Sequence, residues 1–186
     1  MIKEGRMRLT GISLVIILVI IVFFCGCTRN YIVKPFPLEP ELVPKIGQIK
    51  GPINLINTQV PGTKTVFKSG PAIDWVGDLH EWTTQAIDLL THELTQRKVF
   101  ISRNADRVLS LAVTKGTLRS EITGVRCVII LRVTTGNGYV KEYEGNNIHR
   151  ASPFGEMARY YAGANALTEA VIALLNDDNI VRYLQE

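Results

Sequence analysis

The chain has 186 residues, of which 46% are hydrophobic and 20% charged. This composition is typical of one globular domain and excludes a disordered chain. The formal net charge is +4, and it falls to 18 minus 16, or +2, when Lys3, Glu4, Arg6 and Arg8 of the first segment are set aside. So small an excess gives no support for a nucleic-acid partner.

The first segment has the architecture of an export signal. Its basic residues precede a run from Leu14 to Phe24 that contains no polar residue. The run has 11 residues, fewer than the roughly 20 that a membrane-spanning helix needs. We therefore interpret residues 1–26 as a signal peptide, and the alternatives are an uncleaved signal anchor or a cytosolic protein.

The end of this segment, Phe24-Cys25-Gly26-Cys27, resembles the lipobox of bacterial lipoproteins, in which a small residue precedes an invariant cysteine. The resemblance implies cleavage between Gly26 and Cys27, and acyl chains on Cys27 that bind a membrane. Thr28 follows the cysteine, in place of the Asp that signals retention at the inner membrane. The implied location is the periplasmic face of the outer membrane. Cys127 would then be the only free thiol, and no intramolecular disulfide could form.

Residues 27–52 are predicted to form a tether between the lipid and the domain. They show no apolar periodicity and include Pro35, Pro37, Pro40, Pro44 and Pro52. Such a segment favours an extended polyproline-like conformation, which would reach roughly 70 Å at most. The folded periplasmic domain is then expected to span residues 53–186.

The first half of this domain is predicted to hold one strand, one loop and one helix. A strand is expected at 53–58, and the turn-forming residues of 60–77 indicate a long loop. Asp78 and Glu81 have the spacing of a helix-capping pair. An apolar stripe at spacings of three and four follows them and predicts a helix with a core-facing side, formed by Leu79, Trp82, Ala86, Ile87, Leu90 and Leu94.

The second half is predicted to be a strand meander followed by a helix. Strands are expected at 99–101, 108–113, 125–133 and 139–144, with a hairpin turn at Gly136-Asn137-Gly138. Ser152-Pro153 is a typical helix start, and the helix would run to Leu175 before a short final turn at 180–184. The expected fold is α+β, with a single mostly antiparallel sheet and two helices on one face, preceded by the signal peptide and the Pro-rich tether.

Several stretches of the chain are similar to the YajG-type family of uncharacterised bacterial lipoproteins. Besides the lipobox, they are 90–98, 140–145, 166–170 and 176–178, and the resemblance covers roughly residues 50–186. It implies an α+β domain without a catalytic signature. Similar domains recur in auxiliary lipoproteins of envelope transport systems and in lipoprotein activators of cell-wall synthases, which implies an accessory binding role.

The sequence offers little support for catalysis or for a metal. No Gly-x-Ser-x-Gly elbow is present, and His80, His92 and His149 are too dispersed for a local zinc motif. Cys127 shares the parity of the apolar residues of its strand, which favours an inert buried thiol over a redox thiol. We therefore expect no enzyme activity, no catalytic residue, no bound metal and no cofactor.

Three residues are candidates for contact with a partner. Arg126 and Arg132 would lie on the sheet face opposite the core, where a solvated surface is the alternative to an anion-binding stripe. Trp75 belongs to an apolar cluster in the 60–77 loop, which either docks a partner or folds onto the core. The preferred hypothesis is a non-catalytic adaptor for an unidentified envelope protein. A carrier of lipid or glycan fragments is the alternative, and an envelope hydrolase is a weaker one.

Overall fold

The structure is a computed structural model that describes residues 27–39, 42–43, 49, 51–68, 73–150 and 156–186. The predicted signal peptide, including Gly26, lies outside the described residues, as does the predicted helix start at Ser152-Pro153. Within the described ranges, no helix is both long enough and apolar enough to span a bilayer.

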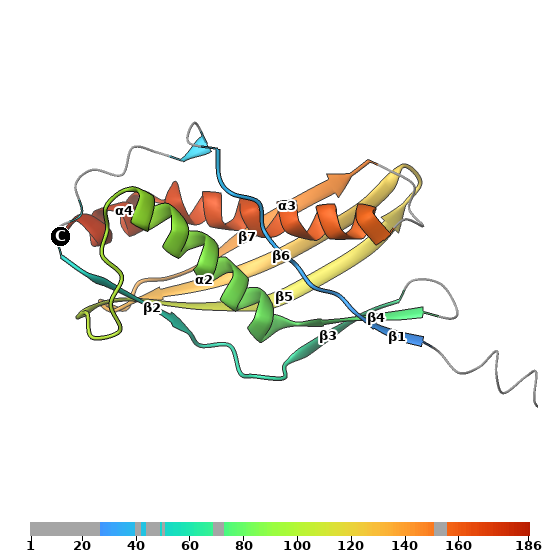
Figure 1. The fold of residues 1–186 in the computed structure, drawn as a ribbon, viewed down its shortest axis with the longest axis horizontal. Helices are drawn as coiled ribbons and strands as arrows, with labels where there is room; N and C mark the ends of the chain where they lie inside the picture. Colours follow the sequence, from blue (N-terminus) through green and yellow to red (C-terminus); the bar gives the residue numbers. More distant parts are fainter. Residues whose placement is uncertain (1–26, 40–41, 44–48, 50, 69–72, 151–155) are drawn as a thin grey trace, which may run out of the picture.

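Two mixed sheets and three helices make up the described fold (Figure 1). The larger sheet has the order β2-β5-β6-β7 and the smaller one has the order β1-β4-β3. In chain order the elements are β1 (Cys27–Asn30), β2 (Ile53–Asn57), β3 (Lys64–Lys68), β4 (Ile73–Asp78), α2 (Leu79–Gln96), β5 (Arg107–Glu121), β6 (Gly124–Thr135), β7 (Val140–His149), α3 (Glu156–Leu175) and α4 (Asp178–Gln185).

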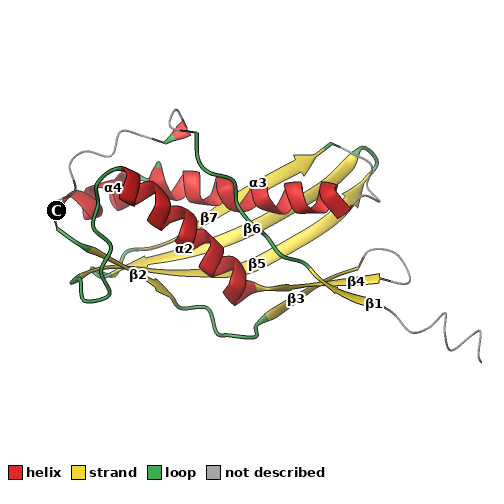
Figure 2. Ribbon diagram, viewed as in Figure 1, coloured by secondary structure: helices red, strands yellow, loops and turns green. Residues whose placement is uncertain are grey.

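The α+β class is confirmed, but the prediction of a single mostly antiparallel sheet is wrong, and a third helix, α4, follows the two expected ones. The β5-β6-β7 meander is antiparallel as expected, whereas β2 pairs with β5 in parallel and β1 pairs with β4 in parallel. Helices α2 and α3 both pack on the larger sheet, and they cover the same face of it (Figure 2). The expected strand at 99–101 is reduced to one bridge between Ile53 and Ile101.

The prediction of a long loop at 60–77 is also wrong, because this stretch contains β3 and β4. Phe67 and Trp75 are register partners in these strands, and both side chains are buried. The two strands have only five and six residues. The prediction therefore followed the glycines and prolines around them, which favour turns. Pairing with β1, from a distant part of the chain, supplies hydrogen bonds that no local pattern announces.

The described part of the expected tether is folded onto the domain. The backbone N–H of Tyr31 donates to the carbonyl of Val76 at 2.7 Å, and Tyr31 and Val33 are 4% and 0% exposed. The segment then crosses the helix layer (Figure 1), where the Phe36 N–H donates to the Thr168 hydroxyl at 3.2 Å. Prolines do not prevent this, because an extended segment needs few backbone donors of its own. The described part of this segment therefore pairs with β4 and contacts α3.

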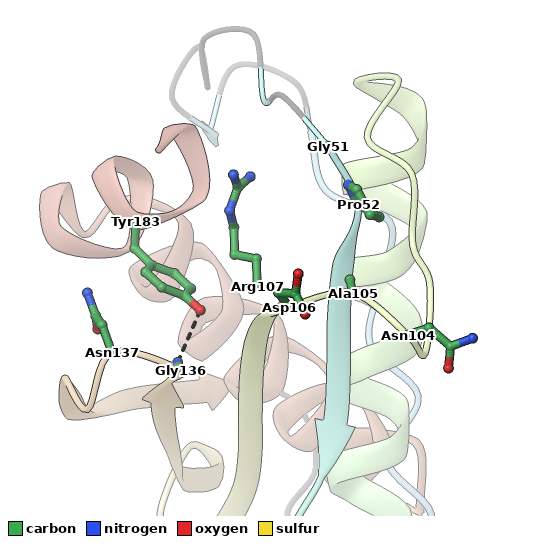
Figure 3. A pocket seen from close by; sticks show the side chains of 9 residues that line it. All are labelled: Gly51, Pro52, Asn104, Ala105, Asp106, Arg107, Gly136, Asn137 and Tyr183. Carbon is green, nitrogen blue, oxygen red and sulfur yellow. Dashed lines mark hydrogen bonds between the residues drawn. The ribbon is translucent and has the colours of Figure 1, made fainter.

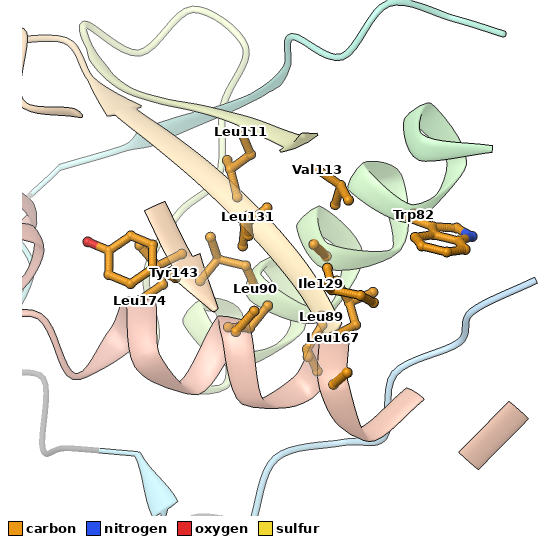
Figure 4. Packing of buried hydrophobic residues seen from close by; sticks show 14 of the residues in the cluster. Trp82, Leu89, Leu90, Leu111, Val113, Ile129, Leu131, Tyr143, Leu167 and Leu174 are labelled. Atoms are coloured by element: carbon orange, nitrogen blue, oxygen red, sulfur yellow. The ribbon is translucent and has the colours of Figure 1, made fainter. Parts of the chain in front are cut away.

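Between the larger sheet and the helices, the core is filled by side chains from both layers (Figure 4). Alternate residues of β6, from Val125 to Val133, are fully buried. Trp82 of α2 lies at the junction with the smaller sheet, where its ring stacks on Phe67 at 5.9 Å between centroids. A Cβ added to Gly77 or Gly116 would come within 2.3 Å of that ring, so both glycines make room for it.

The start of α2 agrees with its sequence pattern. The Asp78 carboxylate accepts hydrogen bonds from the backbone N–H groups of His80 and Glu81, which confirms the predicted N-cap. The predicted buried state of Cys127 is also confirmed, since this residue is 0% exposed. Burial raises the pKa of its thiol to about 12, although a hydrogen bond with Tyr31 acts in the opposite direction, so the thiolate needed for redox chemistry is scarce at neutral pH.

A buried carboxylate joins β7 to the junction of α3 and α4. The side chain of Asp177 is 3% exposed and caps α4 by accepting from the backbone N–H groups of Asn179 and Ile180. It also accepts from Lys141 Nζ at 2.5 Å and from the Tyr143 hydroxyl at 3.0 Å. Burial alone would raise the pKa of this carboxyl, but the hydrogen bonds outweigh it and lower the pKa to about 2.

Asp177→Asn should therefore destabilise the fold in a pH-dependent way. The folded-state pKa is below the ordinary value of 3.8, so the charge stabilises the fold above pH 3.8, and this contribution is lost as the pH falls toward 2. Lowering the pKa by this amount corresponds to about 2.5 kcal/mol of stability. Asn can still cap α4, so the substitution removes the charge and keeps the helix cap. Urea unfolding should show that deficit at pH 7 and a much smaller one near pH 2. The exposed neighbour variant Asp178→Asn is the control, and an Asp177→Asn deficit that is equal at both pH values would contradict the assignment.

Candidate interaction face

The face of the larger sheet that α2 and α3 leave uncovered holds two of the predicted contact residues. Arg126 and Arg132 alternate along β6 with fully buried Cys127, Ile129 and Leu131, so their side chains project away from the helices. The prediction that they share the face opposite the core is confirmed. No helix in the described part of the chain covers this face (Figure 2).

Both arginines are held by acidic or amide partners. Arg132 Nη2 lies 2.8 Å from Glu142 Oε1 of β7, and these two residues are directly opposite in the strand register. Arg126 Nε lies 2.5 Å from Glu121 Oε1, and its Nη1 donates to Asn146 Oδ1 at 2.9 Å. These pairings favour a face of balanced charge over a free basic stripe for anions.

Apolar side chains lie between the two arginine pairs. Val128 and Ile130 have the outward parity of β6 and are only partly buried, and Ala112 lies opposite Arg132 on β5. Ile56 of β2 and Ile148 of β7 are each 37% exposed at the two flanks. Apolar positions bordered by charged pairs are typical of surfaces that bind other proteins reversibly. We call the outward residues of β5, β6 and β7 the outer sheet face.

Trp75 is not part of this face. It lies in β4 of the smaller sheet and is 8% exposed, with the guanidinium groups of Arg29 and Arg159 5.9 and 5.4 Å from its ring centroid. Of the two alternatives for Trp75, folding onto the core is the one observed. Its indole Nε1 is buried and has no hydrogen-bond partner in the described structure.

Cys27 is the first residue of β1 and pairs with Ile73 of β4. The residue proposed to carry lipid is therefore part of a sheet, with no spacer between it and the fold. Its lipidation stays a prediction, as does cleavage after Gly26.

A surface cavity of about 470 Å³ lies at the end of the larger sheet where β5 begins (Figure 3). It is lined by Gly51, Pro52, Asn104, Ala105, Asp106, Arg107, Gly136, Asn137 and Tyr183. The Tyr183 hydroxyl accepts from the N–H groups of Val108 and Gly136 and donates to the Val108 carbonyl, and Arg107 donates to the Leu184 carbonyl at 2.9 Å. These groups connect α4 to the sheet and form no pair of nucleophile and base.

In the described ranges, no three His, Cys, Asp or Glu side chains are grouped so that they could hold a metal ion. His80 and His92 have separate local partners. The Nδ1 of His80 is 2.6 Å from the Gln59 carbonyl, and the Nε2 of His92 is 2.7 Å from Gln96 Nε2.

The sequence reasoning found the arginines of the outer sheet face but missed their partners and the apolar residues between them. Glu142 could have been found from the Gly136-Asn137-Gly138 turn, because a hairpin turn fixes which residues face each other. Val128 and Ile130 could have been found because β6 is almost continuously apolar. A strand with one solvated face normally alternates between apolar and polar residues.

No family model and no curated protein matches the chain. Among solved structures, the chain is similar to the crystal structure of protein XCC0632 from Xanthomonas campestris, which is described by the family model DUF330. The two share 12% sequence identity with a TM-score of 0.45, over 81% of this chain and 93% of that one. A likeness of this degree carries no argument about what this chain does.

Proposed function

We propose that this chain is a lipid-anchored lipoprotein of the bacterial envelope that acts as a non-catalytic adaptor. Its anchor is the acylated Cys27 on the periplasmic face of the outer membrane, and its partner is another envelope protein. The partner would bind the outer sheet face. The resemblance to YajG-type lipoproteins agrees with an accessory role.

The adaptor proposal rests on one observation, which is that the larger sheet has apolar residues on the face that does not contribute to the core. Val128 and Ile130 lie on the uncovered face, while the opposite face of β6 is already packed against α3. Arg126 and Arg132 border them in fixed geometry. Because the sheet is rigid and its charged side chains are already paired, few side chains of this face would lose conformational freedom on binding. This small entropy loss favours affinity.

The alternative, a carrier of lipid or glycan fragments, would need a deep apolar pocket. In this structure the space between sheet and helices is filled by fully buried side chains such as Leu90, Ile129 and Leu167 (Figure 4). The 470 Å³ cavity lies instead at the sheet end, and Asp106, Arg107 and Asn137 are among the residues that line it. The filled core therefore supports the adaptor over the carrier.

The adaptor proposal is tested by site-specific photocrosslinking in intact envelopes of a Gram-negative host. A photoreactive residue at Ile130 should give one protein adduct of discrete mass. The same residue at Asp88, which is exposed on α2 away from this face, is the control and should not give that adduct.

A charge swap then separates recognition from folding. Arg132→Glu combined with Glu142→Arg keeps the cross-strand pair but reverses its direction, so stability should stay within about 0.5 kcal/mol of the wild type. If the partner recognises this face, the Ile130 adduct should decrease strongly. An adduct that forms equally from Asp88, or that is unchanged in the folded swap variant, would exclude the outer sheet face as the binding surface.

A further inference from the structure

Three elements lie at the end of the molecule where β1 begins, with β1 and the β5–β6 turn on opposite sides of that end (Figure 1). The β5–β6 turn and the start of α3 lie at the same end of the long axis as Cys27 (Figure 1). The contacts agree with this placement: Arg29 of β1 forms an ion pair with Glu156 of α3. Gly124 of β6 lies against the backbone of His149 and Arg150. We call this region the anchor end.

The β5–β6 turn carries an isoleucine whose side chain is not packed in the described core. Ile122 is 99% exposed in a two-residue turn between the paired residues Glu121 and Gly124. Such turns favour Asn, Asp and Gly, so neither turn geometry nor the core accounts for an apolar side chain there. Met157, at the start of α3, is 59% exposed at the same end.

The charges beside this turn are mainly positive. Arg119 and Arg126 are directly opposite each other in the register of β5 and β6, a like-charge arrangement that disfavours the sheet. Glu121 neutralises Arg126, while Arg119 and Arg150 both have exposed side chains. An anionic surface at this end would relieve the repulsion and attract both arginines.

The position of Cys27 indicates that the anionic surface facing the anchor end is a membrane. Because β1 starts at the cysteine itself, acyl chains on that residue would hold the anchor end directly against the bilayer. A tether of the kind expected from the sequence would have allowed any orientation. A surface defined by Cys27 and the β5–β6 turn places an exposed isoleucine and two arginines toward the lipid.

We propose that the anchor end is a membrane-docking surface. Ile122 inserts at the boundary between headgroups and acyl chains, and Arg119 and Arg150 contact anionic headgroups. The inference rests on the proposed lipid anchor at Cys27 and adds a fixed orientation to it. With the anchor end down, the strands of the larger sheet rise from the membrane, and the outer sheet face is accessible from the side.

The test uses the mature lipidated chain carrying Ile122→Cys, labelled with a polarity-sensitive fluorophore and reconstituted into phosphatidylethanolamine vesicles with phosphatidylglycerol. Labelling is specific because Cys127 is fully buried. The label should shift its emission to shorter wavelength and be quenched by spin-labelled lipids. Val140→Cys, exposed in the β6–β7 hairpin at the opposite end of β6, is the matched control and should show neither effect.

Further arms separate the possible failures. Arg119→Glu, or omission of phosphatidylglycerol, should reduce the shift at position 122. Equal, water-like emission at positions 122 and 140 in a lipidated chain would overturn the docking proposal while leaving the anchor intact. A shift seen only in native envelopes would assign the turn to a protein partner and also overturn it. Intact masses that show no acyl chains in either the wild type or Cys27→Ala would refute the anchor itself, and the docking proposal with it.

Discussion

Gly145→Ala is expected to lower the free energy of unfolding by about 3 kcal/mol or more, or to prevent folding. A Cβ built on Gly145 of β7 would lie 1.7 Å from the carbonyl oxygen of Ala166 and 2.9 Å from the backbone nitrogen of Ala170 in α3. Both are backbone atoms, so no side chain can move aside to accept the methyl group. The helix would have to move away from β7, which would open the packing around Leu167 and Leu174, both fully buried.

Chemical denaturation measures this effect through the midpoint of the unfolding transition. An unchanged dependence of the unfolding free energy on denaturant concentration would show that the folded and unfolded states are as compact as in the wild type. Glu144→Ala is the matched control, because Glu144 is the exposed neighbour on the same strand and its change should stay within about 0.5 kcal/mol. If Gly145→Ala were no less stable than Glu144→Ala, the close approach of β7 and α3 would be refuted. The packing of the helix layer, on which the uncovered outer sheet face depends, would then have to be revised.

Local patterns predicted the elements whose stabilising contacts are close in sequence. The Asp78 cap and the apolar stripe gave α2, and the Gly136-Asn137-Gly138 turn gave the β6–β7 hairpin, in which Gly138 has the positive φ of 89° that such a turn favours. The buried parity of Cys127 and the outward parity of Arg126 followed from simple alternation along β6.

The elements that the sequence did not reveal depend on distant pairing. Strand β1 has four residues and pairs in parallel with a strand that lies more than 40 residues later, which no local periodicity encodes. A signal was nevertheless present in the next residues. Tyr31 and Val33 alternate with exposed Ile32 and Lys34, a strand-like pattern that the nearby prolines concealed. For the same reason the smaller sheet, and with it the strand that holds Trp75, was missed.

Substitution by Asp at two adjacent positions distinguishes a tether from a folded segment. Val33 is 0% exposed and lies near Gly163 of α3, whereas Ile32 is 45% exposed. Val33→Asp removes apolar burial worth about 2 kcal/mol and places a carboxylate where no water can reach it. We expect a total loss of about 4 kcal/mol or more for Val33→Asp, and less than about 1 kcal/mol for Ile32→Asp. Thermal or urea unfolding of the two variants measures the difference.

The same pair of variants bears on how the anchor acts. If the first residues after Cys27 are part of the fold, the lipid is attached to a rigid sheet, and the domain keeps one orientation on the membrane. Unfolding of Val33→Asp would then free the segment, and protease should cut it in Val33→Asp but not in Ile32→Asp. Equal stabilities and equal cleavage of both variants would restore the flexible tether, in which case the outer sheet face could meet a partner at any height up to the reach of the chain.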